Sequence, residues 1–402
     1  MSYYILPKII SSIIVNPKTD TNECPVYISH SLYNFYSNIK EQIIIMCSKE
    51  LDLINSDYDE LIKIVNPYEY IFSKVPGSKY SVSKLKANTI IFYELLEIIT
   101  TLSILDCFKN KPIKSLHISK DYIDSNSCID LLRENYTSDI FFNFTQNDKG
   151  MIKQFFDQKF DFMFFDIRET NINSYIINLI ENVMLIMRFQ VIGGNSVIKI
   201  NNVFHKPIID LLYILSSFFD KVYIIKPNTS NITTFEKYIV CKNFNNNETK
   251  LELYKSNYQK LNILMENLTC NITSILDFDI PYYFMNKIDE MNIIIGQQQL
   301  ESLDQIINIL KNKNREDKIE NIKKSNIQKS VNWCEKFKIP CNKFSEKVNI
   351  FLPIIKINAD EDEDEINPVS DADDDEKNII INNNIDINFD MSDENSSKDT
   401  DV

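Results

Sequence analysis

The segment that most constrains the fold spans residues 191–242 and predicts the order strand, helix, strand, loop, strand. Gly193 and Gly194 precede NSVIKIN, a β-branched run typical of a strand buried on both faces. Residues 205–219 place apolar side chains around nearly the whole helix, so this helix must lie between other elements. KVYIIKP and KYIVCKNF then predict two further strands, and Pro227 ends the first of them.

Two charged side chains interrupt this apolar pattern. Lys199 lies within VIKI, and Glu236 directly precedes KYIV. A charge in a buried strand is costly unless it is paired or faces a cleft, so these two are candidate site residues. Spacing alone favours an alternative, in which Lys199 reaches solvent from a strand end and Glu236 simply precedes its strand.

Strands and helices also alternate upstream of this segment. The sequence predicts a core helix at residues 87–106, then strand KSLHIS, helix CIDLLREN, strand DIFFNF, helix GMIKQFF, strand FDFMFFD and a long helix at residues 174–190. This alternation predicts an α/β fold with a doubly wound, mostly parallel sheet. Such sheets bind ligands beyond the carboxyl ends of the strands, near the point where the strand order reverses. Asp166 closes FDFMFFD at such an end and is a third candidate.

The formal charge of −14 is a property of one end of the chain. The chain has 57 acidic and 43 basic residues, and 17 of the acidic and 2 of the basic residues follow residue 359. The rest of the chain therefore holds 40 acidic and 41 basic residues. The body of the protein is therefore close to neutral. This balance gives no positive sign of a nucleic-acid surface and does not exclude one.

Cysteine and glycine usage narrows the class of protein further. Eight cysteines are scattered singly, none in a CxxC pair, and only three histidines accompany them. This predicts a reduced, intracellular and cytoplasmic protein without a zinc site. No apolar run reaches ~18 residues, so no membrane-spanning segment is expected. Five glycines in the whole chain leave few places for a glycine-dependent loop.

Four segments together resemble the FtsJ-like family of RNA 2′-O-methyltransferases, which includes cap-methylating enzymes of large DNA viruses. They are FYELLEI at residues 92–98, FDFMFFD, GGNSVIKI and KPNTSNITTFEKYIV, and the resemblance covers residues 84–244. The last two are the most specific, because they keep the family's order of GG…KI, a strand ending in KP, a Ser/Thr-rich loop and E-x-Y-I-V. The resemblance implies a Rossmann-like seven-stranded methyltransferase sheet in which KYIVCKNF is the one antiparallel strand, inserted between its neighbours.

The resemblance also implies a site for methyl transfer from S-adenosylmethionine to a ribose hydroxyl of RNA, including capped mRNA. The family's catalytic set is Lys, Asp, Lys and Glu, and Asp166, Lys199 and Glu236 match the last three by position. A lysine with a lowered pKa can accept the hydroxyl proton while carboxylates orient it. Asp148 matches the acid that contacts the cofactor's adenine, although a loop aspartate is also a common turn former. If the protein is viral, its place is the host cytoplasm or the virion.

The chain departs from the family at the first position of the catalytic set. Glu94 stands there, where the family has a lysine. An acid at this position reverses a charge and shifts the pKa of its close neighbours. Lys84 or Lys86, in the preceding turn, could take the place of the missing lysine.

The segment after the first strand of the resemblance departs as well. KSLHIS leads into KDYIDSNS, which has no glycine where the family has a glycine-rich cofactor loop, and Tyr122 and Ile123 replace small residues. Asp166 is followed by Ile167 and Arg168, where the family again has small residues. These changes predict that S-adenosylmethionine binds weakly or not at all.

Four parts are predicted along the chain. They are an N-terminal extension at residues 1–83, the FtsJ-like domain at 84–246, a helical C-terminal module at 247–350 and an acidic tail at 351–402. Charge repulsion and a low apolar content should leave the tail disordered. An apolar stripe from Leu300 to Leu310 favours core packing over a partner surface. Trp333 is interpreted as an anchor of the C-terminal module, with base stacking as the alternative.

Two functions fit these observations. The first is an active RNA 2′-O-methyltransferase, which the retained Asp166, Lys199 and Glu236 favour. The second is a pseudoenzyme, a degenerate methyltransferase domain that binds RNA or supports another capping or methyltransferase subunit. The missing glycines and Glu94 favour the second function, and so does the sequence as a whole.

Overall fold

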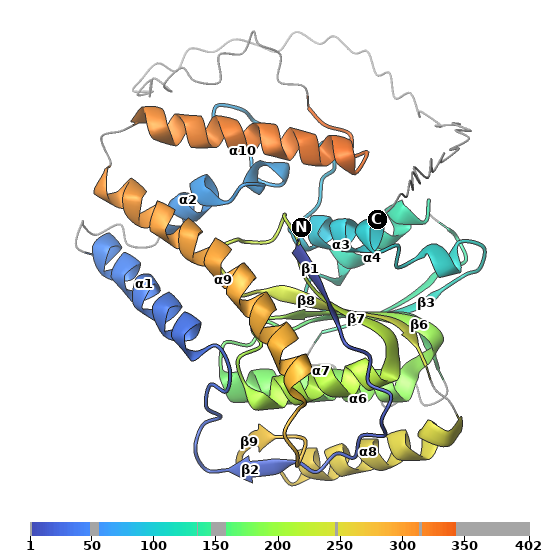
Figure 1. Cartoon of the computed structure of the whole chain (residues 1–402). Helices are drawn as coiled ribbons and strands as arrows, with labels where there is room; N and C mark the ends of the chain where they lie inside the picture. Colours follow the sequence, from blue (N-terminus) through green and yellow to red (C-terminus); the bar gives the residue numbers. More distant parts are fainter. Residues whose placement is uncertain are drawn as a thin grey trace, which may run out of the picture. The chain divides into compact units, whose positions relative to one another are not determined.

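A seven-stranded sheet runs through the middle of the described chain, with helices on both faces (Figure 1). The computed structural model describes residues 2–48, 56–134, 136–145, 158–245, 248–312 and 316–342, all within the first of two units, Met1–Pro353 and Ile354–Val402. Its strands are β1 (Ser2–Leu6), β3 (Lys114–Ile118), β4 (Ile140–Phe144), β5 (Phe160–Asp166), β6 (Gln190–Ile200), β7 (Phe219–Lys226) and β8 (Lys237–Phe244). Their order in the sheet is β1-β7-β8-β6-β5-β3-β4. The predicted α/β class and the number of strands are confirmed.

Strand directions agree with the sequence prediction except at one edge of the sheet. β8 lies between β6 and β7 and is antiparallel to both, as predicted. The prediction that β8 is the one antiparallel strand is wrong, because β1 pairs antiparallel with β7. In β1 every second residue is more exposed than its neighbours, and Pro7 directly follows the strand. Both features are typical of a strand at the edge of a sheet. The beginning of the N-terminal extension is therefore part of the central sheet.

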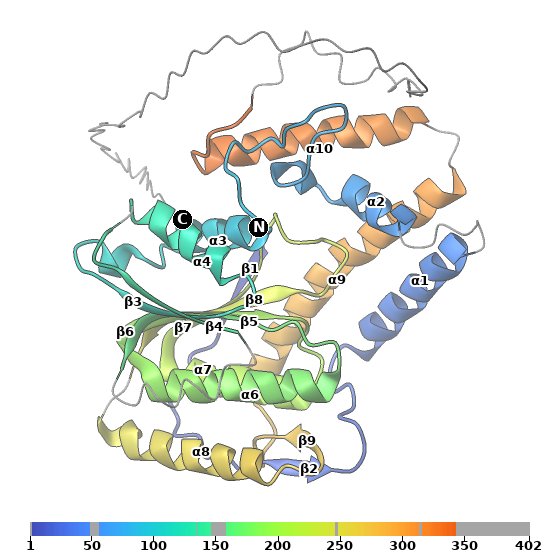
Figure 2. The ribbon, with the colours of Figure 1, turned by 180° about the vertical axis from the view of Figure 1, so that it is seen from behind.

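Different helices cover the two faces of the sheet (Figures 1 and 2). They are α3 (Ile91–Thr101) and α4 (Tyr122–Leu132) on one face and α6 (Ile172–Phe189) and α7 (Lys206–Phe218) on the other. Beyond α6 lie α8 (Glu248–Glu266) and a two-stranded sheet of β2 (Lys18–Asp20) and β9 (Asn271–Ser274). Neighbouring strand residues divide between two cores, since Phe164 packs on the α3 side and Phe165 on the α6 side. Each such side chain stabilises the fold by roughly 1.5–3 kcal/mol when fully buried.

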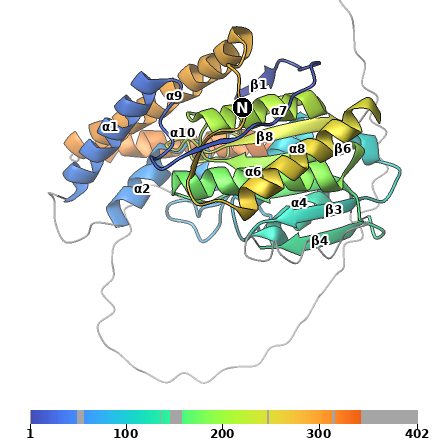
Figure 3. The same cartoon turned by 90° about the horizontal axis from the view of Figure 1, so that it is seen from below.

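Helices from both ends of the chain pack together beside the sheet. They are α1 (His30–Ser48), α2 (Ser56–Val65), α9 (Tyr282–Lys311) and α10 (Glu316–Lys336), with α1 along α9 (Figure 3). A Cβ at Gly296 would collide with Leu32, so glycine allows α1 and α9 to approach closely. Leu303, Ile306 and Leu310 are buried in the core shared by α1, α2 and α9. The predicted apolar stripe is therefore core packing, as the sequence favours.

Some sequence predictions fall on residues outside the described ranges. They concern the helix GMIKQFF, Asp148 and the acidic tail at 351–402. The division of the chain at residues 83, 246 and 350 stays a prediction. In the described ranges, no helix is both long and apolar enough to cross a membrane.

Candidate functional site

Three of the candidate side chains meet at the carboxyl edge of the sheet. Asp166 and Lys199 are partners in the register of β5 and β6, so both lie at this edge. Glu236 directly precedes β8, and its Oε2 atom lies 3.7 Å from Lys199 Nζ. The fold thus brings Asp166, Lys199 and Glu236 together, and their role in catalysis stays a prediction.

Glu94 joins this group from α3. Lys199 Nζ donates a hydrogen bond of 3.0 Å to Glu94 Oε2, and the Tyr238 hydroxyl donates to the same oxygen. Only 1% of Glu94 is exposed, so the two charges form a buried ion pair. Lys84 and Lys86 are exposed in the segment before α3. An acid, and not a lysine from that segment, therefore contacts Lys199.

The surrounding charges decide the protonation of Lys199. Burial by itself lowers the pKa of this ammonium group, but the carboxylates of Glu94, Glu236 and Asp166 outweigh burial and raise the pKa above its ordinary value. Burial raises the pKa of Asp166, against the opposing effect of Lys199 and Arg168. Lys199 is therefore protonated at neutral pH, and a protonated lysine cannot accept a proton.

An arginine bridges the ends of β3 and β5. The chain passes from β3 to β4 on one side and then to β5 on the other, so the strand order reverses between β3 and β5. Arg168 donates from Nε to Asp166 Oδ2 at 2.6 Å and from Nη2 to Asp121, which follows β3. Ser119 Oγ also donates to Asp166 Oδ2, at 3.2 Å. The two strand ends are thus tied together at the reversal point.

The segment after β3 is shorter than the sequence suggests. α4 begins at Tyr122, so only residues 119–121 form the connection, and most of the glycine-free KDYIDSNS is helix rather than loop. Asp124, in the first turn of α4, is buried and accepts hydrogen bonds from the Asn88 backbone N–H (3.0 Å) and the Thr89 hydroxyl (2.6 Å). These bonds fix α4 to the segment before α3.

The loop that carries Glu236 is fixed by a buried carboxylate. Glu97 of α3 accepts hydrogen bonds from the backbone N–H groups of Asn228 (3.1 Å) and Thr229 (3.2 Å). Trp333 of α10 donates from its indole Nε1 to the same carboxylate, at 3.2 Å. Trp333 is 3% exposed, so the interpretation of this side chain as an anchor is confirmed. α10 thereby supports the edge of the sheet that holds the candidate site.

A buried lysine fills the inside of the same loop. The Lys226 ammonium donates to the backbone carbonyls of Asn231, Thr234 and Glu236 at 2.8–2.9 Å. Gln299 of α9 also donates to the Thr234 carbonyl. Neither this lysine nor Glu97 is among the candidates that the sequence predicts, although Glu97 in LLEII is a charge inside an apolar run, as Lys199 is in VIKI.

Removing the Glu97 carboxylate is expected to release this loop. Glu97→Ala leaves two backbone N–H groups and the indole N–H without their acceptor, which costs about 1–3 kcal/mol for each buried group. Amide hydrogen exchange at Asn228 and Thr229 should become faster than in the unchanged protein. Glu97→Gln is the intermediate control, because its single carbonyl oxygen can replace Oε2, which accepts from Thr229 and Trp333, but not also Oε1, which accepts from Asn228. Unchanged exchange in Glu97→Ala would contradict this account of the loop.

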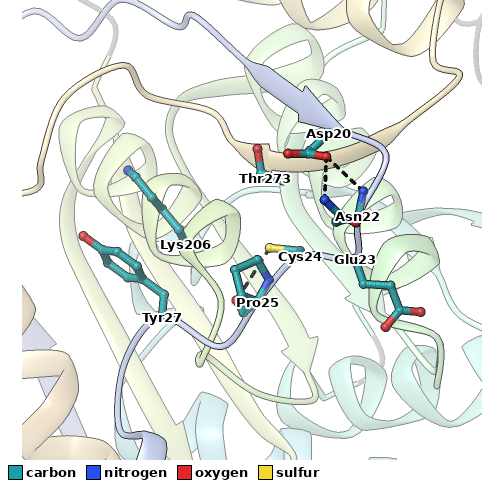
Figure 4. A pocket seen from close by; sticks show the side chains of 8 residues that line it. All are labelled: Asp20, Asn22, Glu23, Cys24, Pro25, Tyr27, Lys206 and Thr273. Carbon is teal, nitrogen blue, oxygen red and sulfur yellow. Dashed lines mark hydrogen bonds between the residues drawn. The ribbon is translucent and has the colours of Figure 1, made fainter.

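A separate hollow lies near β2 and β9 (Figure 4). Its volume is about 450 Å³, and its lining residues are Asp20, Asn22, Glu23, Cys24, Pro25, Tyr27, Lys206 and Thr273. Asp20 accepts hydrogen bonds from Asn22, and the Cys24 thiol donates to the Pro25 carbonyl. Because carboxylates and an ammonium group share the wall, this hollow does not select one sign of charge.

The fold and the site define a class of protein. A doubly wound sheet with β8 inserted antiparallel between β6 and β7, and polar groups at the reversal point, is a Rossmann-like methyltransferase fold. Residues 121–244 match the model of the family described as FtsJ-like methyltransferase. Over these residues the chain is similar to the FtsJ-like methyltransferases, a family whose members generally use S-adenosylmethionine.

Several known proteins are similar to parts of this chain. Uncharacterized protein R383 of Acanthamoeba polyphaga mimivirus is 22% identical over 310 residues, 73% of this chain and 81% of that protein. Cap-specific mRNA (nucleoside-2′-O-)-methyltransferase 1 of Dictyostelium discoideum is 37% identical over 98 residues, 20% of this chain and 13% of that protein. The corresponding methyltransferase 2 of Drosophila melanogaster is 30% identical over 103 residues, 26% of this chain and 15% of that protein. The chain thus spans only a small part of the two cap-specific enzymes.

One solved structure with a similar arrangement is the Methanococcus jannaschii fibrillarin pre-rRNA processing protein. It is 12% identical, and the match covers 41% of this chain and 89% of that protein with a TM-score of 0.23. The fold assignment follows from the strand order and from the family match of residues 121–244.

Proposed function

We propose that this protein takes part in the processing of RNA, including capped mRNA, without transferring a methyl group itself. In this role it is an accessory subunit beside another capping or methyltransferase protein. The observation that carries the proposal is the Arg168 bridge between Asp121 and Asp166. RNA as the partner is inferred from the two cap-specific mRNA methyltransferases that this chain resembles.

The described residues at the reversal point do not fit S-adenosylmethionine. Ligands of this fold class lie beyond the carboxyl ends of the strands at that point, where Arg168 joins Asp121 to Asp166. A ligand there would separate Arg168 from Asp166, whose side chain is fully buried and would lose a charged partner. Residues 119–121 all carry a Cβ, so their backbone cannot approach a ligand as a glycine loop does.

The protonation of Lys199 supports the same proposal. A general base works best when its pKa lies near the operating pH. Glu94 stands where the family has a lysine, and together with Glu236 and Asp166 it raises the pKa of Lys199. Lys199 then holds its proton at neutral pH and does not deprotonate a ribose hydroxyl.

Calorimetric titration of the purified chain with S-adenosylmethionine is the direct test. We expect no binding tighter than about 1 mM, and no transfer of labelled methyl groups to capped or uncapped RNA. An active FtsJ-like enzyme titrated in the same way is the control for the cofactor and the assay. Low-micromolar binding together with methyl transfer would overturn the proposal.

The alternative function is an active S-adenosylmethionine-dependent RNA 2′-O-methyltransferase with a divergent cofactor site. The convergence of Asp166, Lys199 and Glu236 favours it. In that case Glu236→Gln should lower methyl transfer without unfolding the protein, because 40% of the Glu236 side chain is exposed. Thermal unfolding of the variant, measured alongside, separates loss of activity from loss of structure.

A further inference from the structure

A pocket near the amino end of β5, at the opposite end of the strands from Lys199, is lined by positively charged side chains. Its volume is about 410 Å³, and its lining residues are Lys159, Met187, Arg188, Tyr254, Lys255, Tyr258 and Gln259. The walls come from α6 and α8, which pack side by side (Figures 1 and 2). Lys159 directly precedes β5, which ends at Asp166, so this α6–α8 pocket lies roughly 20 Å from the candidate site along the strand.

Three cations line the α6–α8 pocket, and no carboxylate does so among the described residues. The Lys159 ammonium donates to the Arg188 carbonyl, so two like-charged residues are held together. Burial and the charge of Arg188 lower the pKa of Lys159. An anion between the cations would relieve the repulsion. Unlike the hollow near β2 and β9, this pocket therefore selects a negative ligand.

Two tyrosines give the α6–α8 pocket an aromatic wall. Tyr254 is 4% exposed, and its ring centroid lies 4.4 Å from that of Phe218, which holds it in place. The Arg188 guanidinium lies 5.8 Å from the ring centroid of Tyr258 and donates to the Tyr258 hydroxyl at 3.2 Å. Cations beside aromatic rings are how proteins bind single-stranded nucleic acid, with phosphates on the cations and bases on the rings.

The size of the α6–α8 pocket limits its ligand. At about 410 Å³ it lies near the lower end of the range of small-ligand pockets, about 300–1,000 Å³. That volume suits a single nucleotide unit. Double-stranded RNA, in contrast, is recognised by its shape across an extended surface.

We propose that the α6–α8 pocket binds one nucleotide of single-stranded RNA. The cations Lys159, Arg188 and Lys255 hold its phosphate, and Tyr258 contacts its base. The choice of RNA as the source of the nucleotide rests on the function proposed above. The binding itself is independent of methyl transfer, because the pocket and the candidate site lie at opposite edges of the sheet.

Fluorescence anisotropy with a short labelled oligouridylate tests this proposal on the full chain. Lys255→Glu is expected to weaken binding about tenfold at low salt and to reduce the slope of log K against log salt by about 0.7. Lys329→Glu, at an exposed lysine of α10, is the matched control and should change the affinity less than about twofold. Tyr258→Leu should weaken binding, whereas Tyr258→Phe, which keeps the ring, should not.

Three results would overturn the proposal. They are the absence of RNA binding by the unchanged protein, equal effects of Lys255→Glu and Lys329→Glu, and displacement of the RNA by polyglutamate as readily as by unlabelled oligouridylate. The last result would identify a general anion surface. These three results concern only RNA binding, and the absence of methyl transfer is tested separately by the titration with S-adenosylmethionine. Conversely, methyl transfer by the purified chain would leave the binding comparison valid.

Discussion

Replacing Lys199 with methionine is expected to lower the free energy of unfolding by about 3–5 kcal/mol. The change removes the cation that donates to Glu94, which is 1% exposed. Because neighbouring carboxylates raise the pKa of Lys199, its contribution is present at neutral pH and up to the unfolded-lysine value of about 10.4. It is lost only as the pH rises through the higher folded value. Urea unfolding at pH 7 therefore measures the whole effect.

Two further variants isolate the ion pair. Lys287→Met removes an exposed pair with Glu290, whose side chains are 35% and 53% exposed, and should cost less than about 1 kcal/mol. The double variant Lys199→Met/Glu94→Gln should recover most of the loss, because the neutral amide can still accept from the Tyr238 hydroxyl. A loss below about 1 kcal/mol in Lys199→Met would mean that the pair is solvated and that the neighbouring carboxylates do not raise the pKa of Lys199.

The central elements of the fold could be predicted because each carries its own local pattern. The apolar runs of β6, α7, β7 and β8 have the lengths and the flanking Gly and Pro of their elements. β1 could not be placed in the same way, because its register pairs Ser2 with Lys226 and no local feature of YYIL specifies that distant partner. The pairing of β2 with β9 depends likewise on two short segments far apart in the sequence.

The residues of the candidate site likewise fall into those with a local signal in the sequence and those whose contacts depend on distant segments. Asp166 and Lys199 could be found because a charge at the end of an apolar strand is a local signal. The sequence shows Arg168 only as a residue at a position where the family has small ones, because its bonds to Asp121 and Asp166 depend on the order of the strands. The missing glycines predict a poor cofactor loop, which stays a prediction, and the sequence does not show that most of this segment is helix.

Two buried lysines next to the loop that carries Glu236 have opposite surroundings. Lys226 is surrounded by three backbone carbonyls that accept from it. Lys237, on β8, is fully buried, and its ammonium lies 4.0 Å from Met291 Sδ and 5.8 Å from the ring centroid of Phe235. Burial and the charge of Lys226 lower the pKa of Lys237 from 10.5 to about 7. Burying Lys237 therefore lowers the free energy of unfolding.

Lys237→Met is expected to stabilise the protein by about 4 kcal/mol at pH 7. The unfolded chain keeps a lysine proton up to about pH 10.4, whereas the folded state releases that of Lys237 near pH 7. Between these values the unfolded state binds more protons, so the stability of the unchanged protein rises with pH, and the gain from Lys237→Met should shrink to about 1 kcal/mol near pH 9.5. Urea unfolding of both proteins across this range measures the difference.

Lys226→Met is the control for this last prediction and should stabilise the protein less than Lys237→Met does. Burial lowers the pKa of Lys226 only to about 8. Its removal also takes the donor from the Glu236 carbonyl, which costs about 1–3 kcal/mol if that carbonyl stays buried, whereas the Asn231 carbonyl keeps the Thr234 hydroxyl and the Thr234 carbonyl keeps Gln299. Two lysines from neighbouring strands, replaced by the same side chain, would then change stability by different amounts because one has hydrogen-bond acceptors and the other has a thioether and a ring. Equal gains from Lys237→Met at pH 7 and near pH 9.5 would mean that Lys237 reaches solvent and titrates as an ordinary lysine.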